Sequence, residues 1–437
     1  MEQVKACCRG KGKEMVVIEN NIVKEKIYIE KLESGLTIMI MPKKEMQKKF
    51  FIIATKYGSI DSKFVIPNEV EETFVPDGIA HFLEHKLFEQ ENGINSLDTL
   101  SALGANPNAY TTTDHTAYHI EPTENLTQSL DEFMHYVQNP YFTDENVEKE
   151  KGIIGQEIVM YDDHPTWQVY LNALKALYKE NPINIDTIGT AKTISHINKE
   201  ILYKCYNTFY HPSNMVLMAI GDFIPEEILE EIKKRIINKE NQGEIKRIYP
   251  EEPKEINKKQ IEKNMDISVP LFAIAFKDDI PDENIIKRHI GIEILLNMLI
   301  GKSTSSYKAL YEKGLLLVEP DLDYEYSKTY AYTMISGQSK DPNKVIETIK
   351  NEIENFKKND LDLEHFERTK KKIYGEYITE YNSISDIGRM FVSDYLKGIN
   401  SFDYLENFEQ ITHEYAKQIL KELFVEEKMG ISIIWNK

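Results

Sequence analysis

The hydrophobic pattern at the start of the chain predicts antiparallel strands followed by helices. Between Val23 and Tyr57 lie three runs rich in Ile, Val, Phe and Tyr: IYIEKL, LTIMIM and FFIIATKYG. Ser34-Gly35 and a lysine-rich stretch separate them, which is typical of strands joined by turns. Apolar residues then recur with the helical period over 79–89, 96–103, 126–138 and 144–160, while Thr116–Ile120 alternates like a strand. This order predicts an α+β fold.

The same kind of cycle begins again further along the chain. A helix-rich stretch from Trp167 to Tyr210 leads to an apolar strand over 215–220 and a helix after Pro225. Residues 238–264 are polar, contain Pro and Gly and lack an apolar face, so we expect a linker there. Beyond it the pattern predicts strands at LFAIAF and 330–335 and helices over 285–300, 306–313, 343–357 and 363–381.

Two short segments suggest that the halves are repeats. SLDTLSALG (96–104) and SYKALYEKG (306–314) have the same length, and each reads as a short helix that opens with Ser and ends at Gly. We therefore expect two homologous lobes, each an antiparallel sheet packed with helices, that face each other across a cleft. The predicted division is a flexible tail at 1–14, a first lobe at 15–237 and a second lobe at 265–437.

Composition narrows the classes of function. The 437 residues are 41% hydrophobic and 29% charged, which is typical of a folded protein with more than one domain. The net charge of −19 argues against binding to nucleic acid or anionic membranes; it either attracts cationic peptides or only keeps the chain soluble. Three cysteines cannot form a disulfide framework, so we expect a cytoplasmic protein. No apolar run approaches the ~18 residues that a membrane span requires.

The strongest chemical signal is His81-Phe82-Leu83-Glu84-His85. On a helix the histidines at i and i+4 project from one face and can bind one metal ion, while Phe82 and Leu83 can face the core. The alternative is a pair of ordinary histidines at the surface or core edge of a helix. A catalytic zinc site needs a third protein ligand and one open position. The histidines alone therefore leave the site incomplete.

A second helix can supply the missing carboxylate. Glu150 and Glu157 lie seven residues apart and share one helical face, while Val147, Ile154 and Ile158 line another. By spacing alone either glutamate can reach the metal. Glutamates on a lysine-rich helix are also common as solvated surface groups, so their assignment depends on the histidine motif.

With these motifs the sequence resembles the inverzincin metallopeptidases of the pitrilysin, insulin-degrading enzyme and mitochondrial processing peptidase type, which are marked by H-x-x-E-H. In that family a helix of the form E-x-x-x-x-x-x-E follows the motif, and its second glutamate completes the zinc site. The resemblance therefore implies one Zn²⁺ per chain, with His81, His85 and Glu157 as ligands and Glu150 as a supporting carboxylate. It also implies that Glu84 acts as the general base on a zinc-bound water.

Weaker matches follow in family order. Asn108, Ala109 and Tyr110 resemble the edge strand that binds substrate in the family, where an extended peptide is recognised by strand addition. Gly189-Thr190, the segment Tyr210 to Met215, and Gly221 also match. The family fold consists of two homologous α+β lobes per chain of this length, with zinc in the first.

One segment departs from the family. Many members carry an Arg and a Tyr in the second lobe, in a sequence like L-R-E-x-x-G-L-A-Y, whereas this chain has LYEKGLLLV at 310–318. In some two-chain members a homologous partner without the zinc motif supplies both residues, so the resemblance implies that this chain is the zinc-bearing subunit of such a heterodimer of bacterial type.

The predicted function is a zinc endopeptidase that cleaves small or unfolded peptides, including leader or precursor peptides. The alternative is a non-catalytic subunit that binds peptides or serves assembly, because a fold does not guarantee a function.

Overall fold

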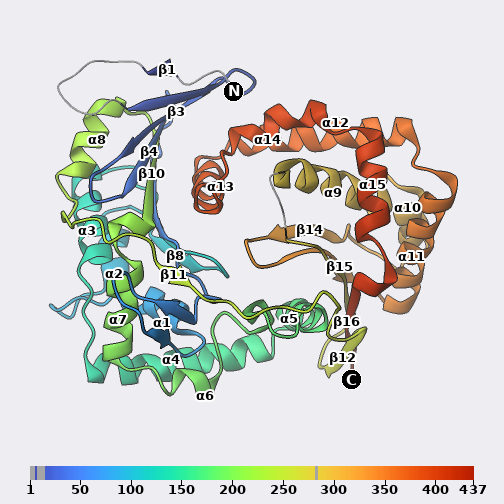
Figure 1. Cartoon of the computed structure of the whole chain (residues 1–437), viewed down its shortest axis with the longest axis horizontal. Coiled ribbons are helices and arrows are strands. Elements are labelled where there is room, and N and C mark those ends of the chain that lie inside the picture. The colour runs from blue at the N-terminus through green and yellow to red at the C-terminus, as the bar shows by residue number, and fades with distance from the viewer. Residues whose placement is uncertain (1–4, 7–14, 281–283) are drawn as a thin grey trace. The chain divides into compact units, whose positions relative to one another are not determined.

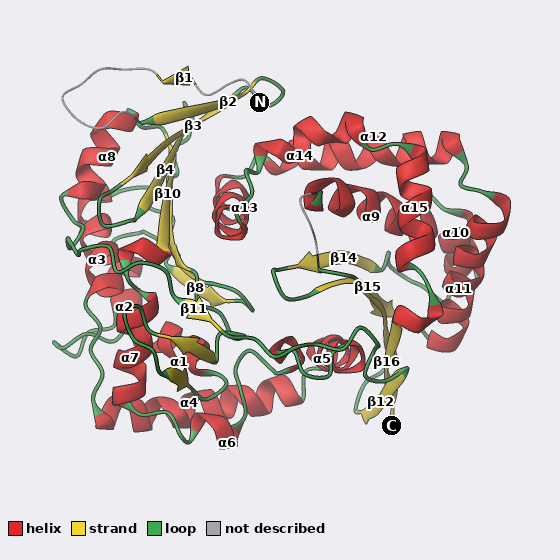
Figure 2. Cartoon of the chain, viewed as in Figure 1, coloured by secondary structure: helices red, strands yellow, loops and turns green. Residues whose placement is uncertain are grey.

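The structure, a computed structural model, describes residues 5–6, 15–280 and 284–437 and has the predicted α+β class (Figure 1). The chain forms two compact units. The first comprises Met1–Gln156, Asp186–Ile248 and Glu380–Ser401, and the second comprises Glu157–Ile185, Tyr249–Thr379 and Phe402–Lys437. Each unit combines a largely antiparallel sheet with helices (Figure 2). In the part of the chain that the structure describes, no helix is long and apolar enough to cross a membrane.

The first unit is built on a long mixed sheet. Its strands lie in the order β1 (Lys5–Ala6), β2 (Val16–Asn20), β3 (Glu25–Lys31), β4 (Thr37–Pro42), β10 (Met215–Gly221), β5 (Phe50–Thr55), β9 (Thr116–Ile120) and β8 (Asn108–Thr111). The three apolar runs at the start of the chain form β3, β4 and β5, as predicted. A small sheet of β11 (Lys246–Arg247), β6 (Lys63–Val65) and β7 (Glu72–Phe74) lies in the same unit.

In the first unit, α1 (Ile79–Lys86), α2 (Ser96–Ala102), α3 (Leu126–Gln138) and α4 (Asp144–Asp162) start where the sequence predicts and differ by a few residues at their ends. The α6 (Ala191–Ile194) and α7 (Lys199–Phe209) helices lie in the predicted helix-rich stretch, and α8 (Pro225–Lys233) is the helix predicted after Pro225. The α13 helix (Ile384–Lys397) was not predicted. The α4 helix continues into the second unit, because the division falls between Gln156 and Glu157.

The second unit contains a sheet with the order β12 (Gln260–Met265), β16 (Met429–Asn436), β13 (Leu271–Lys277), β15 (Ala331–Gln338) and β14 (Asp321–Tyr326). Its helices are α5 (Pro165–Leu177), α9 (Ile285–Ile300), α10 (Ser305–Glu312), α11 (Pro342–Asn359), α12 (Leu363–Glu380), α14 (Phe402–Asn407) and α15 (His413–Leu423).

The two units repeat one topology. In the first, β4 pairs parallel with β10, and β10, β5, β9 and β8 then pair antiparallel in that order. In the second, β12 pairs parallel with β16, and β16, β13, β15 and β14 then pair antiparallel. The chain visits both sets in the same sequence. This agreement supports the duplication that the short repeated segments suggested.

The repeated short helices differ from the prediction in their caps. The side chain of Asn95, one residue before the expected Ser96, accepts a hydrogen bond from a backbone N–H group of α2. The side chain of Thr304, two residues before the expected Ser306, does the same for α10. The serines therefore do not cap these helices. Gly104 and Gly314 follow the helices with φ of 77° and 65°, as expected for glycine in the left-handed region.

The units do not follow the predicted boundaries, because each contains a helix from the other half of the sequence. The α13 helix packs on β10 and β5 of the first unit, and α5 packs on β16 and β13 of the second. Their amphipathic patterns show that one face is buried, but not against which sheet. The expected linker at 238–264 contains β11 and the start of β12. Of the predicted tail at 1–14, all but Lys5–Ala6 lies outside the described residues.

Candidate active site

The α1 helix carries the H-x-x-E-H motif in the first unit. Ile79, Phe82 and Leu83 are buried in the core, whereas His81 and Glu84 are each 8% exposed. The helix follows Gly78, whose φ is 91°, and a Cβ there would lie 2.5 Å from the carbonyl oxygen of Ile188. A Cβ on Gly189 would lie equally close to the carbonyl oxygen of Asp77. The matched Gly189-Thr190 therefore lets a loop pass close to the start of the motif helix.

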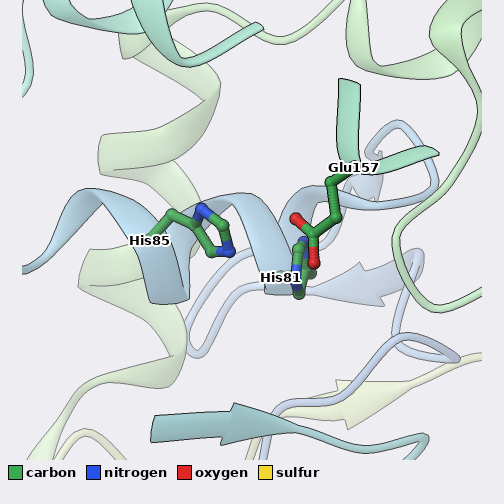
Figure 3. A group of neighbouring side chains, drawn as sticks. All are labelled: His81, His85 and Glu157. Atoms are coloured by element: carbon green, nitrogen blue, oxygen red, sulfur yellow. The ribbon is translucent and has the colours of Figure 1, made fainter. Parts of the chain in front are cut away.

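The α4 helix brings a carboxylate to the two histidines. One ligand atom each from His81, His85 and Glu157 lies within 4.8 Å of the others (Figure 3). Glu157 extends from the continuous α4, one residue beyond the part assigned to the first unit. Val147, Ile154 and Ile158 bury the opposite stripe of α4, as their spacing predicted. Among the residues that the structure describes, these three form the one cluster of potential metal ligands that could hold an ion.

The geometry separates the two glutamates that spacing left equivalent. Glu150 lies outside the three-residue group, and its Oε1 is 3.0 Å from His85 Nδ1. An imidazole that donates from Nδ1 to a carboxylate keeps the Nε2 lone pair available for a metal ion. Glu150 is 5% exposed, so this contact is shielded from water. It therefore orients the His85 ring, and Glu157 is the glutamate that lies in one group with both histidines.

Burial favours the neutral form of His81. Loss of hydration, and secondarily the neighbouring His85, lowers the pKa of His81 from 6.5 to about 3. The two ring centroids are 4.5 Å apart. Because a neutral imidazole is the form that binds metal ions, the site holds His81 in that form without a metal-induced change.

Glu84 is held by a threonine that the sequence did not single out. The Thr111 hydroxyl donates a hydrogen bond of 2.6 Å to Glu84 Oε2. Thr111 ends β8, directly after the predicted substrate-binding residues, and β8 lies beside α1. Nothing in the sequence indicates this contact, since a threonine at the end of a strand is common. It fixes one carboxylate oxygen of the candidate base.

The predicted substrate-binding residues form an edge strand. Among the described strands β8 pairs with β9 alone and ends the sheet. Asn108 is exposed, whereas Ala109 and Tyr110 are half-buried. The Tyr110 ring packs on His115 and His119, with centroids 5.6 and 6.4 Å away. Burial raises the pKa of Tyr110 to about 12, which keeps its hydroxyl neutral. The free edge of β8 thus lies next to the motif helix.

Another matched family segment has a structural role. The Asn214 side-chain amide donates hydrogen bonds to Thr55 Oγ1 and to the carbonyl oxygens of Lys56 and Phe209. These contacts join the start of β10 to the end of β5. The segment from Tyr210 to Met215 therefore holds the central strands of the sheet together.

The segment that departs from the family exposes apolar side chains. Leu317 and Val318, which follow α10, are 61% and 62% exposed, and Tyr311 is 54% exposed. No arginine stands in this segment. The segment thus exposes Tyr311, Leu317 and Val318, and neither the Arg nor the Tyr of the family stands in its expected place.

Comparison with known proteins identifies the family to which the chain is similar. Residues 70–191 match the family model described as Insulinase (Peptidase family M16), and residues 196–373 match the one described as Peptidase M16 inactive domain. The chain is 37% identical over 420 residues to the uncharacterised zinc protease YmfH of Bacillus subtilis, covering 95% of this chain and 97% of that protein.

Solved structures show the same fold. A crystal structure of an M16-like peptidase from Alicyclobacillus acidocaldarius superimposes with a TM-score of 0.90 at 33% identity, covering 94% of this chain and 99% of the other. A protease structure from Helicobacter pylori, at 20% identity, shares the fold with a TM-score of 0.79 over 94% and 99% of the two chains. With the H-x-x-E-H helix and the paired topology, these similarities show that the chain belongs to the M16 (insulinase) family of zinc peptidases.

Proposed function

We propose that this chain is a zinc-dependent endopeptidase that cleaves small or unfolded peptides, with His81, His85 and Glu157 as the metal ligands. The observation that carries the proposal is the convergence of their ligand atoms within 4.8 Å. Its support from relatives is that several are named zinc proteases.

The donor set fits zinc. Two imidazole nitrogens and one carboxylate form the ligand set of many catalytic zinc sites, which keep a fourth position open. A bound zinc ion would supply Lewis acidity and lower the pKa of a coordinated water to about 7. The protein contributes His81 in its neutral form and a Glu150 carboxylate that orients the His85 ring.

Glu84 is the proposed general base. Its carboxylate accepts the proton of the attacking water and then delivers a proton to the nitrogen of the leaving amine. The Thr111 hydroxyl bound to Oε2 restricts rotation of the carboxylate. Because Glu84 lies between the two histidines on α1, its reach to a water near them is set by the helix itself.

The β8 edge is the proposed peptide site. An extended peptide that pairs with Asn108 to Tyr110 is recognised through its backbone, so many side chains are accepted. A folded protein offers few such extended segments, which favours small or unfolded substrates. Leader or precursor peptides belong to this class.

We also propose that the active form is a heterodimer with a homologous chain that lacks the zinc motif. The support is the sequence LYEKGLLLV at 310–318, which has no Arg and no Tyr in the place expected from the family, and the exposure of Leu317 and Val318. One relative is named as a beta subunit of a mitochondrial-processing peptidase. The low cysteine content supports a cytoplasmic location for the pair.

Glu84→Gln tests the catalytic proposal. The amide cannot accept the proton, so we expect cleavage of an unfolded peptide to fall at least about 100-fold while zinc content stays equal to that of the wild type. Glu148→Gln on the exposed face of α4, where Glu148 pairs with Lys151, is the matched control.

Undiminished turnover in Glu84→Gln would contradict the base assignment. A wild-type chain that binds zinc but cleaves no peptide, even with its partner, would favour the alternative of a peptide-binding or assembly subunit. A wild-type chain that binds no zinc would exclude the metal site itself.

A further inference from the structure

Lys86, which directly follows the motif, is a completely buried lysine. Its side chain is 0% exposed, and its Nζ lies 2.5 Å from Glu89 Oε2 and 3.8 Å from Glu150 Oε2. An ammonium group is rarely buried unless carboxylates compensate its charge. Its position in the last turn of α1 adds a favourable interaction with the helix dipole. The two carboxylates therefore compensate a charge that the packing of α1 shields from water.

Glu150 is shared between this lysine and a proposed metal ligand. Its Oε1 contacts His85 Nδ1 at 3.0 Å, while its Oε2 faces Lys86 Nζ. The side chain of Glu150 is 6% exposed, so both contacts are made away from water, where electrostatic interactions are strong. The three side chains thus form a row from Lys86 through Glu150 to His85.

Glu89 makes the lysine necessary for this arrangement. It contacts Lys86 through Oε2, and its Oε1 is 3.8 Å from Lys149. Two carboxylates, Glu89 and Glu150, therefore lie around the same buried ammonium. Without the positive charge between them, they repel each other, and the Glu150 carboxylate is no longer held with Oε1 toward His85.

We propose that Lys86 is a positioning residue for the metal site: through Glu150 it holds the His85 ring with Nδ1 toward the carboxylate, so that Nε2 would be the nitrogen that binds zinc. This inference rests on the proposed zinc site and deepens it. Groups that orient a metal-bound histidine typically change metal affinity or activity by about 10- to 100-fold when they are removed. Lys86 acts one contact further away, so the effect lies at the lower end of that range.

The chain offers a matched control. Lys149 Nζ lies 3.8 Å from Oε1 of the same Glu89, but its side chain is 70% exposed. Within the described part of the chain, Lys149 forms no ion pair with Glu150. Lys86→Met and Lys149→Met each remove one positive charge beside Glu89. Only Lys86→Met removes the charge beside Glu150.

The test measures zinc affinity by competition with a chelator and the protonation of the His85 ring nitrogens by ¹⁵N NMR. In Lys86→Met we expect zinc affinity to fall about tenfold and Nδ1 protonation of His85 to become mixed, while Lys149→Met matches the wild type. Adding Lys86→Met to Glu150→Gln should weaken zinc binding no further, because the lysine acts through that glutamate.

Other outcomes have distinct meanings. A folded Lys86→Met with wild-type zinc affinity and an unchanged His85 ring would overturn the inference and leave the proposed function intact. If Lys86→Met does not fold, the same measurements are made on Lys86→Gln. Its amide can still donate a hydrogen bond to Glu89 but has no charge. A wild-type chain that binds no zinc would overturn both the proposed function and the role of Lys86.

Discussion

At the scale of single residues, the candidate site depends on partners that hold each functional group. His85 has Glu150, Glu84 has Thr111, and His81 is kept neutral by burial. Such contacts fix orientation and protonation before any substrate arrives. Their loss should therefore affect catalysis more than stability.

Replacement of Thr111 tests this view. Thr111→Val removes the hydroxyl that donates to Glu84 but keeps the shape of the side chain. A hydrogen bond to a charged group contributes roughly 1.5–3 kcal/mol, so we expect peptide cleavage to fall about tenfold or more, with zinc affinity unchanged. Steady-state kinetics measures the effect. Thr111→Ser, which keeps the hydroxyl, should retain most activity, and an equal loss in both variants would show that the hydrogen bond is not responsible.

A buried histidine on the strand next to β8 makes stability depend on pH. Burial, and to a smaller degree the charge of Arg389, lowers the pKa of His119 from 6.5 to about 4. Below about pH 6.5 the unfolded chain binds a proton that the folded chain refuses until about pH 4. The free energy of unfolding should therefore decrease as the pH falls from 6.5 to 4.

Denaturant unfolding of the metal-free chain at pH 7.5 and pH 5 measures this effect. Between these two pH values the free energy of unfolding should fall by about 2 kcal/mol less in His119→Gln than in the wild type, because the amide does not titrate. Equal losses in the two proteins would show that His119 is protonated as readily in the folded chain as in the unfolded one.

At the scale of elements, close approach decides which sheet each helix covers. A Cβ on Gly388 of α13 would lie 2.3 Å from Phe50 Cε1 on β5. On α5 of the second unit, Leu177 and Ala176 come within 3.0 and 3.1 Å of a Cβ built on Gly430 of β16. In both units, glycine at the contact lets a helix from the other half of the sequence lie directly on the sheet.

Two helical glycines provide opposite expectations for alanine. Gly388→Ala forces a clash with Phe50, so we expect destabilisation by about 1–3 kcal/mol despite the better helix propensity of alanine. Gly375→Ala on α12, where nothing lies within 4 Å of the new Cβ, should stabilise by up to about 1 kcal/mol. Thermal unfolding of both variants measures the difference. A stabilised Gly388→Ala would show that α13 does not pack closely on β5.

At the scale of the whole molecule, the H-x-x-E-H motif stands on α1 of the first unit and has no counterpart on α9 of the second. The α9 helix follows β13 as α1 follows the strands that include β5, but its sequence has no H-x-x-E-H. Within the described residues, the one group that could hold a metal ion is therefore His81, His85 and Glu157.

Purification of the tagged chain from its native cell tests the proposed heterodimer. We expect a one-to-one complex with a homologous chain that lacks H-x-x-E-H and carries Arg and Tyr at the positions matching 310–318. Mass spectrometry and native mass determination give identity and stoichiometry. A fully active complex that contains only this polypeptide would contradict the proposal, and the site would then be completed within the chain.

The sequence alone determined the features that depend on local pattern. The strands β3 to β5 and the helices α1 to α4 follow from apolar periods of two and 3.6 residues, because each such segment must bury one face. The spacing of His81 and His85 on one helix, and the resemblance of the chain to the M16 family, also required no coordinates. Relatives and solved structures confirm that family.

Contacts between distant segments distinguish two glutamates that their spacing leaves equivalent. Glu150 and Glu157 share a helical face, and the position of α1 beside α4 determines that one contacts His85 Nδ1 while the other joins the metal-ligand group. The contacts of Thr111 with Glu84 and of Lys86 with Glu150 also depend on tertiary packing. The same holds for α5 and α13, each of which belongs to the unit built mainly from the other half of the sequence. Such contacts join residues far apart in the chain, and a hydrophobic period records that a face is buried but not which partner covers it.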